Sequence, residues 1–167
     1  MTLRLEDIER IKQLKHRYMR MLDSGDSEGL AGCFVPEATI RYEGGSYLYE
    51  ANGRDEIIAM LGQMQNNQYV GMHLALMPEI DVAEDGAVAE GRWYMVDWAV
   101  NMATNRMTHG TALYHDHYVH RDGEWRIRHS GYVRLFERVE MLKEPIDLKS
   151  HAFARFGPPM LGGVLPR

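Results

Sequence analysis

The chain of 167 residues has few of the features that mark secreted, membrane or nucleic-acid-binding proteins. Its single cysteine, Cys33, excludes an intramolecular disulfide framework and favours a reducing compartment. No apolar run approaches the roughly 18 residues of a membrane-spanning helix, and the amphipathic, acidic N-terminus is unlike a signal peptide. The net charge of −5 is spread without a basic stripe, which argues against nucleic acid as a partner. We therefore expect a cytoplasmic protein.

Length and composition indicate one globular domain with room for a sizeable core. The chain is 45% hydrophobic and 26% charged, which is typical of soluble globular domains. Cys33 lies in the apolar run LAGCFV, so we predict a buried thiol and not a nucleophile. The 12 methionines suit an irregular core or an adaptable apolar pocket.

The order of helix-like and strand-like segments predicts an α+β fold. Helical spacing predicts a first helix that ends near Leu22, a second, capped by Asp26 or Ser27, that extends to about Phe34, and a third from Arg54 to about Gln65. ATIRYE predicts a strand, GSYLYEANG an irregular or extended segment, and four strand-like runs follow, at about 72–83, 88–100, 107–120 and 125–136.

EDG and RDG turns join the first and last pairs of these four runs. We expect a curved antiparallel sheet wrapped around the three N-terminal helices, a cone-shaped α+β barrel over residues 1–142. Residues 143–167 hold four prolines and three glycines and predict an extended C-terminal arm.

Asp97 lies in the middle of a strand-like run, VAEGRWYMVDWAV. Strand side chains alternate between faces, so Asp97 shares a face with Trp93, Met95 and Ala99. A carboxylate on an apolar face must find a partner or lose its charge, and both outcomes are used in active sites. The alternatives are an exposed face or a bond to a nearby backbone amide.

His73 begins the preceding strand-like run and shares a face with Ala75 and Met77. Antiparallel pairing across the EDG turn brings His73 close to Asp97. We therefore predict that Asp97 holds one ring nitrogen while the other accepts a proton. The alternative is a histidine with a structural hydrogen bond.

Three further polar residues stand at unusual places. Tyr18 lies in the apolar stripe of the first helix and is either a core tyrosine or a buried hydroxyl with a partner. Asp23 stands at that helix's C-terminus, where the macrodipole disfavours a carboxylate, so it is an exposed turn residue or serves another purpose. Arg134 either pairs with a structural acid or holds an anionic oxygen, and it shares a face with Ser130, Tyr132 and Phe136.

The histidine-rich run HDHYVH allows a metal site but does not favour one. His115 and His117 lie on one strand face, with His109 further along it. No third ligand follows at a convincing spacing, so we expect a solvated strand face. The next charges after Arg134 are interpreted as ordinary surface residues: Glu137, Arg138 and Glu140.

Four blocks of the sequence resemble a known family: Tyr18-x4-Asp23, Met72-His73, GRWYMVDW around Asp97, and Gly131-Tyr132-Val133-Arg134. With the element order, they are similar to the SnoaL-like branch of the nuclear transport factor 2-like superfamily, and within it to the bile-acid 7α-dehydratases. The resemblance runs from about residue 6 to about residue 140. Residues 101–109 and the tail from about 143 depart from the pattern.

The resemblance implies a conical apolar pocket and five catalytic residues, Tyr18, Asp23, His73, Asp97 and Arg134. It implies no metal and no cofactor. The favoured activity is that of a lyase that removes water from a large, mostly apolar ring compound with a hydroxyl β or vinylogous to a carbonyl. His73 would remove the C–H proton, Tyr18 would be the acid tuned by Asp23, and Arg134 would stabilise negative charge.

A steroid is the substrate that the resemblance implies, and a lignin-derived or polyketide aromatic is equally compatible. The alternatives are isomerisation, retro-aldol cleavage with loss of a one-carbon fragment, or a non-catalytic binding or interaction module. The non-catalytic alternative predicts His73 and Asp97 far apart or outward, whereas the enzyme alternative predicts both in one cavity with Tyr18. Aromatic residues on both strand faces, such as Tyr94 opposite Trp93, also predict a homo-oligomer. The resemblance suggests a trimer, and the wider superfamily often forms dimers.

Overall fold

The structure of the chain, a computed structural model, describes residues 3–45 and 47–158. Within them lie three α-helices, α1 (Leu5–Ser24), α2 (Ser27–Gly32) and α3 (Arg54–Gly62), and the 3-10 turn η1 (Ala152–Arg155). The strands are β1 (Phe34–Glu43), β2 (Leu48–Asn52), β3 (Tyr69–Val82), β4 (Val88–Asn101), β5 (Arg106–Arg121) and β6 (Glu124–Met141). The segment predicted as irregular or extended contains β2, and α2 and α3 end earlier than predicted. In this part of the chain, no helix has both the length and the apolar character needed to cross a membrane.

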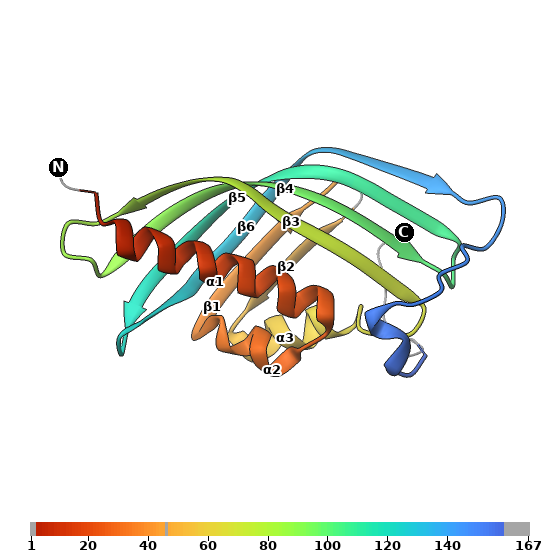
Figure 1. Ribbon diagram of the computed structural model, residues 1–167, viewed down its shortest axis with the longest axis horizontal. Helices are drawn as coiled ribbons and strands as arrows, with labels where there is room; N and C mark the ends of the chain where they lie inside the picture. Colours follow the sequence, from red (N-terminus) through yellow and green to blue (C-terminus); the bar gives the residue numbers. More distant parts are fainter. Residues whose placement is uncertain (1–2, 46, 159–167) are drawn as a thin grey trace.

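The strands form one sheet in the order β2-β1-β6-β5-β4-β3. It curves over α1, α2 and α3, which lie on its concave side (Figure 1), so the predicted α+β architecture is confirmed. The sheet is mixed and not wholly antiparallel, because β1 runs parallel to β6. Parallel neighbours need a crossover connection, and the chain between β1 and β6 provides it.

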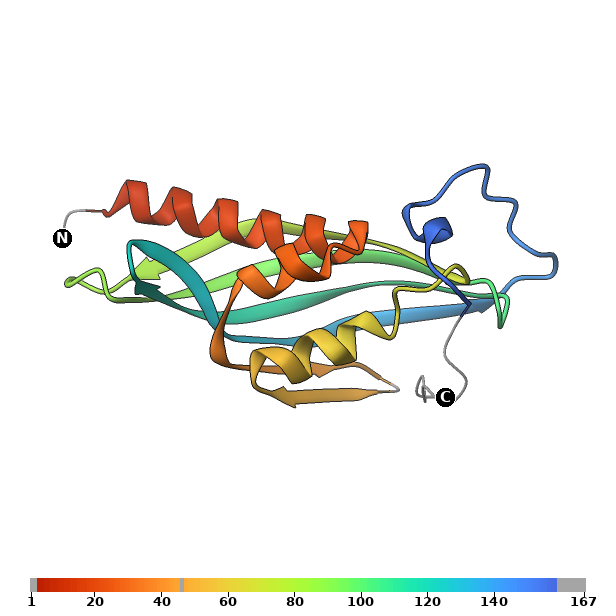
Figure 2. The same cartoon turned by 90° about the horizontal axis from the view of Figure 1, so that it is seen from below.

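Helix α1 packs along the sheet through the predicted apolar stripe, and Ile11, Leu14 and Tyr18 are buried. It lies beside β3 and β4, whereas α3 lies near β1 and β2 (Figure 2). The helix ends because Gly25 adopts φ 69°, where a side chain would be strained. The N–H of Gly25 then bonds the Leu22 carbonyl, which places Asp23 in the last turn.

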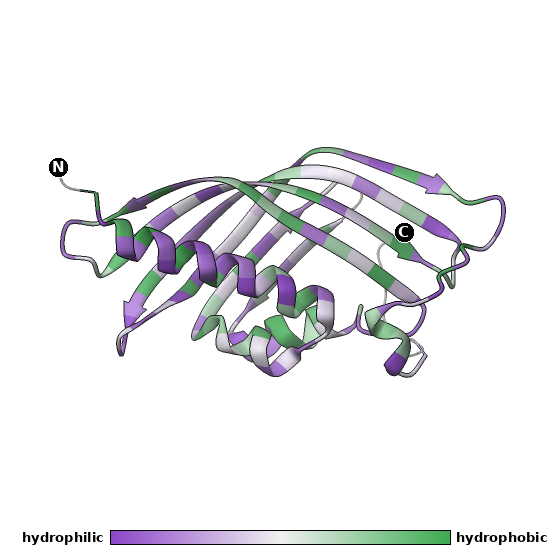
Figure 3. Ribbon diagram, viewed as in Figure 1, coloured by the Kyte–Doolittle hydropathy of each residue, from purple (hydrophilic) through white to green (hydrophobic). Residues whose placement is uncertain are grey.

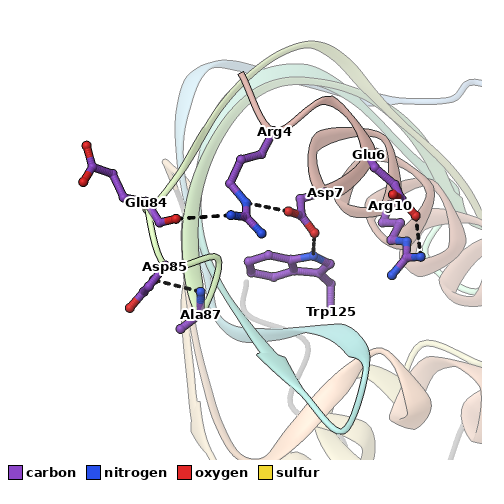
Figure 4. A network of polar contacts seen from close by, with 8 residues as sticks. All are labelled: Arg4, Glu6, Asp7, Arg10, Glu84, Asp85, Ala87 and Trp125. Carbon is purple, nitrogen blue, oxygen red and sulfur yellow. Dashed lines mark hydrogen bonds and ion pairs between the residues drawn. The ribbon is translucent and has the colours of Figure 1, made fainter. Parts of the chain in front are cut away.

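A polar network anchors the N-terminal end of α1 (Figure 4). The Trp125 indole donates to Asp7 Oδ1 at 2.9 Å, and Arg4 Nε donates to Asp7 Oδ2 at 2.7 Å. Arg4 also reaches the Glu84 carbonyl in the β3–β4 turn. The helix is therefore held at this end to two separate parts of the sheet.

The strands alternate between a buried inner face and a more exposed outer face. Figure 3 shows hydrophilic and hydrophobic segments alternating along the strands. Trp93 and Met95 are each 1% exposed, whereas Tyr94 is 41% exposed. A buried ion pair also lies on the inner face: Lys15 Nζ on α1 is 2.7 Å from Asp116 Oδ2 on β5, and both side chains are fully buried. Cys33 is buried as predicted, and burial raises the pKa of its thiol to about 11.

A β-bulge in β6 changes which residues face inward. Thr111 of β5 pairs with Phe136, but the next residue, Ala112, pairs with Arg134. The extra residue reverses the alternation beyond Arg134. Phe136 therefore lies on the outer face beside His109 and not with Arg134, so its predicted face was wrong. Glu137 points inward, and its side chain is only 8% exposed, so it is not a surface charge.

The described part of the C-terminal arm folds back onto the domain. The Asn67 N–H donates to the Gly157 carbonyl, and Arg155 donates to the Ser24 carbonyl at the end of α1. Phe153 in η1 is 4% exposed and stacks with Tyr69. The arm thus covers the C-terminal end of α1. The rest of the predicted arm, residues 159–167, lies outside the described residues.

Candidate active site

A cavity of about 470 Å³ lies between the helices and the inner face of the sheet. Small-molecule sites commonly have this size. Four of the five predicted residues line it: Tyr18, His73, Asp97 and Arg134. The fifth, Asp23, lies behind His73 in a small hollow that Phe153 helps to line.

His73 is held by Asp23 and not by Asp97. Asp23 Oδ1 is 2.6 Å from His73 Nδ1, and Asp23 Oδ2 accepts the backbone N–H of His73 at 2.8 Å. A carboxylate only accepts hydrogen bonds, so Nδ1 carries a proton, and in the neutral ring Nε2 is the nitrogen with the lone pair. Nε2 has no protein hydrogen-bond partner among the described residues. The predicted partner was therefore wrong, although His73 and Asp97 do lie opposite each other in the β3–β4 register.

Asp97 instead forms a two-point ion pair with Arg134. The distances are 2.5 Å from Arg134 Nη1 to Asp97 Oδ1 and 2.6 Å from Arg134 Nη2 to Asp97 Oδ2. Both side chains are largely buried, with 6% of Asp97 and 8% of Arg134 exposed. Burial lowers the pKa of Arg134, but the hydrogen bonds and charge of Asp97 more than offset this effect and raise it overall. Asp97 thus fixes and neutralises the guanidinium at the cavity wall.

Tyr18 shares a hydrogen bond with Tyr42 of β1, 2.8 Å between the hydroxyl oxygens. The Tyr42 hydroxyl also lies 3.4 Å from Ser130 Oγ, to which it donates. Burial raises the pKa of both phenols well above the ordinary value. Both hydroxyls therefore stay protonated at neutral pH, and both residues line the cavity as potential hydrogen-bond donors.

Sequence reasoning missed other residues of the cavity wall. The Tyr47 hydroxyl accepts a hydrogen bond from Arg134 Nε at 2.9 Å and lies 2.6 Å from the Tyr132 hydroxyl. Tyr47 precedes β2 in a connection with no strand alternation, so no local pattern could place it. Glu137, 3.6 Å from Arg134 Nε, was missed because the bulge is invisible in the sequence. Tyr42 could have been found, since it alternates in β1 with buried Ile40 and Ala38.

His109, His115 and His117 of β5 lie on the outer face, away from the cavity. The structure supplies the third ligand that spacing did not: Glu90 of β4 pairs in register with His117. Ligand atoms of Glu90, His115 and His117 all lie within 4.8 Å of one another. Spacing along β5 could not indicate Glu90, because this carboxylate comes from the neighbouring strand.

A family sequence profile described as a SnoaL-like domain matches residues 3–131, which is most of the chain. The chain belongs to the SnoaL-like family. The architecture agrees with this assignment, since the SnoaL-like chain combines a curved sheet with helices on its concave side.

Solved structures share this fold at low sequence identity. A candidate scytalone dehydratase from Novosphingobium aromaticivorans is 18% identical, with a TM-score of 0.73 over 87% of this chain and 95% of its own. The type 3 hexachlorocyclohexane dehydrochlorinase LinA from Novosphingobium barchaimii is 14% identical, with a TM-score of 0.73 over 87% and 97%. ActVI-ORFA from Streptomyces coelicolor is 21% identical, with a TM-score of 0.63 over 77% and 96%. At these identities the likeness shows the fold alone, and the fold supports several chemistries.

Proposed function

We propose that this SnoaL-like chain is a cofactor-independent lyase, a dehydratase that removes water from a ring-containing β-hydroxy carbonyl compound. The observation that carries the proposal is the His73–Asp23 pair, which leaves His73 Nε2 without a protein partner at the wall of an apolar cavity. An oriented imidazole in such a place is suited to remove a proton from carbon. Two similar folds belong to proteins whose names describe eliminations, a dehydratase and a dehydrochlorinase.

His73 acts as the base in this mechanism. Nε2 takes the proton from the carbon next to the carbonyl, and the electron pair of the C–H bond moves into an enolate. Asp23 accepts from Nδ1 throughout, so it stabilises the imidazolium that forms. The C–O bond of the β-hydroxyl then breaks as the double bond forms, and the imidazolium returns its proton to the departing oxygen. Water leaves, and His73 is neutral again.

Tyr18 and Arg134 stabilise the developing charge. A substrate oxygen that replaces Tyr42 as the partner of Tyr18 receives a hydrogen bond from a phenol that burial keeps protonated. Arg134 keeps its orientation through Asp97 and Tyr47, so its remaining N–H groups are held in place as hydrogen-bond donors for the enolate oxygen. Donors held in place before the reaction need no reorganisation during it.

A fused-ring probe, 3-hydroxy-1-tetralone, tests the proposal, because loss of water followed by tautomerisation gives the fluorescent product 1-naphthol. We expect turnover that slows when the carbon next to the carbonyl carries deuterium and that survives exhaustive chelation. His73→Ala should abolish it, whereas His129→Ala, outside the cavity lining, should not. Chelator-sensitive activity restored by zinc would contradict the mechanism. Binding of the probe without 1-naphthol formation would favour the non-catalytic alternative.

A further inference from the structure

The cavity contains a second arginine whose charge is not matched by the protein. Arg106, at the start of β5, lines the cavity together with Arg134. Its Nε is buried and has no hydrogen-bond partner, and no ion pair involves Arg106 in the described part of the chain. The two carboxylates of the lining, Asp97 and Glu137, both lie beside Arg134 instead. Arg106 as a whole is half-buried, but a buried N–H without a partner is costly unless a ligand supplies the acceptor.

Arg106 stands at one end of the cavity, at a distance from the base along the strands. Arg106 pairs in register with Asn101 of β4, and His73 pairs with Asp97 of the same strand. Asp97 lies four residues before Asn101. At about 3.3 Å per residue the two pairs are roughly 13 Å apart. Asn101 and Thr108 line the cavity near Arg106 and add neutral hydrogen-bonding groups.

We propose that Arg106 binds a carboxylate of the substrate at this end of the cavity. The inference rests on the proposed function only in taking His73 as the place where the reacting carbon lies. It narrows the substrate class to ring compounds that carry a carboxylate on the part of the molecule remote from the reacting carbon. Arginine suits this role because its planar fork matches a carboxylate at two points.

A matched pair of fluorescent probes tests the subsite without turnover: 6-hydroxy-2-naphthoate and its methyl ester, which differ in charge. The native protein should bind the acid at least ten-fold more tightly than the ester. Arg106→Gln should remove the preference by weakening acid binding alone, and Arg106→Lys should retain part of it. Arg138→Gln, which alters an exposed arginine of the outer face, should change nothing.

The carboxylate subsite would be contradicted if the native protein bound the acid no more tightly than the ester. It would also be contradicted if the preference for the acid persisted in Arg106→Gln. Failure of the proposed function looks different. In that case 3-hydroxy-1-tetralone yields no 1-naphthol, while the preference for the acid and its loss in Arg106→Gln remain. Conversely, dehydration that requires His73 together with equal binding of both probes would remove only the subsite.

A second site lies on the outer face of the sheet and rests on separate observations. His115 and His117 are two residues apart on β5, and their ring centroids are 4.9 Å apart. His115 Nε2 is 3.2 Å from Glu90 Oε2 on the neighbouring strand. The paired strands hold all three ligands on one face without a loop, because residues i and i+2 of a strand project in the same direction.

We infer that Glu90, His115 and His117 bind a divalent transition metal such as Zn²⁺. Two imidazoles and one carboxylate are ligands that zinc commonly accepts, and water completes a tetrahedral site. The three ligand atoms already lie within 4.8 Å of one another, close to the spacing of ligands around one ion. The site lies across the sheet from the cavity, so metal binding here is independent of the proposed reaction.

Calorimetric titration of tag-free protein with zinc chloride tests this site. We expect one equivalent to bind at micromolar concentration and Co²⁺ to give a visible spectrum typical of tetrahedral coordination. His117→Ala and Glu90→Gln should each weaken binding at least ten-fold. His109→Ala, on the same strand and face, should have no effect. Zinc binding that is unchanged in His117→Ala, equally weakened in His109→Ala, or absent at micromolar concentration would overturn the inference.

Discussion

Asp23, and not Asp97, orients His73, although strand pairing alone predicts this role for Asp97. Asp23 stands at the unfavourable end of the α1 dipole, and its two hydrogen bonds to His73 offset that cost. Asp97 lies opposite His73 in register, yet the five-donor guanidinium of Arg134 offers it a two-point bond. Each carboxylate has therefore taken the partner that satisfies both of its oxygens.

The first prediction concerns this choice of partner. Asp23→Asn and His73→Ala should each lower the rate of 3-hydroxy-1-tetralone dehydration by about 10²–10⁴-fold, the usual contribution of a general base. The double variant should lose little more than the worse single variant, because the two residues act as a unit. Rates of the three variants give the coupling directly.

Asp97→Asn combined with His73→Ala provides the matched comparison. Asp97 acts through Arg134 and not through His73. The activity losses of Asp97→Asn and His73→Ala should therefore be closer to additive than those of Asp23→Asn and His73→Ala. Full additivity between Asp23 and His73 would show that they are not one device. Strong coupling of His73 to Asp97 alone would mean that Asp97 orients His73, as the strand register suggests.

The second prediction concerns the buried Lys15–Asp116 pair. Lys15→Met should destabilise the protein by about 3–5 kcal/mol, because it leaves the Asp116 charge buried without its cation. The double variant Lys15→Met, Asp116→Asn should recover much of that loss, since no buried charge remains. Guanidinium unfolding of the three proteins measures this difference. A double variant as unstable as the sum of the singles would mean that packing of Lys15 on the Tyr114 ring dominates.

Among the elements, α1 does most to position the site. Its first turn is tied to the sheet by Asp7, and its last turn carries Asp23 to His73. The helix therefore spans the domain from the β3–β4 turn to the His73–Asp23 pair. A change that loosens the Asp7 end of the helix should also shift the Asp23 end, because the apolar stripe between the two ends packs as one surface.

The third prediction uses the pKa of Asp7. The Trp125 hydrogen bond lowers this pKa most, and Arg4 adds to the effect. A group whose pKa is lower in the folded state than in the unfolded state stabilises the fold at pH values above its unfolded-state pKa. This stabilisation is lost as the pH falls through its folded-state pKa. Asp7→Asn should therefore lower the free energy of unfolding by roughly 1–2 kcal/mol at neutral pH and by much less near pH 2.

Urea unfolding at a series of pH values checks the effect of Asp7→Asn. Glu6→Gln is the matched control from the same turn, since Glu6 is 79% exposed and its pair with Arg10 should contribute within about 0.5 kcal/mol. A difference between Asp7→Asn and the native protein that does not shrink in acid would count against a charge effect.

Over the whole molecule, the outer face of the sheet carries a row of exposed apolar side chains. Leu76, Tyr94, Leu113 and Val133 are neighbours in register across four strands. They are 39%, 41%, 42% and 58% exposed, respectively. Contiguous apolar patches of this kind usually mark an interface, which fits the homo-oligomer expected from the strand pattern.

The fourth prediction is that the chain self-associates through this row, with a trimer favoured and a dimer possible. Sedimentation velocity at micromolar concentration should show the oligomer in the native protein. Leu113→Glu should dissociate it, because a charge would be buried at the interface. Leu48→Glu, at a 51% exposed leucine of β2 outside the row, should not. A native protein that sediments as a stable monomer would contradict the prediction.

The sequence by itself determined the helices, the strands and the face on which most residues lie. Periods of 3.6 and 2 are local properties, so the burial of Tyr18, Trp93 and Asp97 follows from their neighbours along the chain. Four of the five residues that the family resemblance implied line one cavity. Local periodicity could not show that β1 runs parallel to β6, because pairing across the sheet depends on long-range contacts.

Only the tertiary structure decided which polar groups meet. Asp23 reaches His73 because the end of α1 crosses β3, and Glu137 enters the cavity because a bulge in β6 reverses the alternation. Glu90 joins His117 through pairing of two strands, with no motif in either strand alone. Periodicity specifies a direction for each side chain, whereas a hydrogen bond needs two atoms within about 3 Å. That distance is set by how the elements pack together.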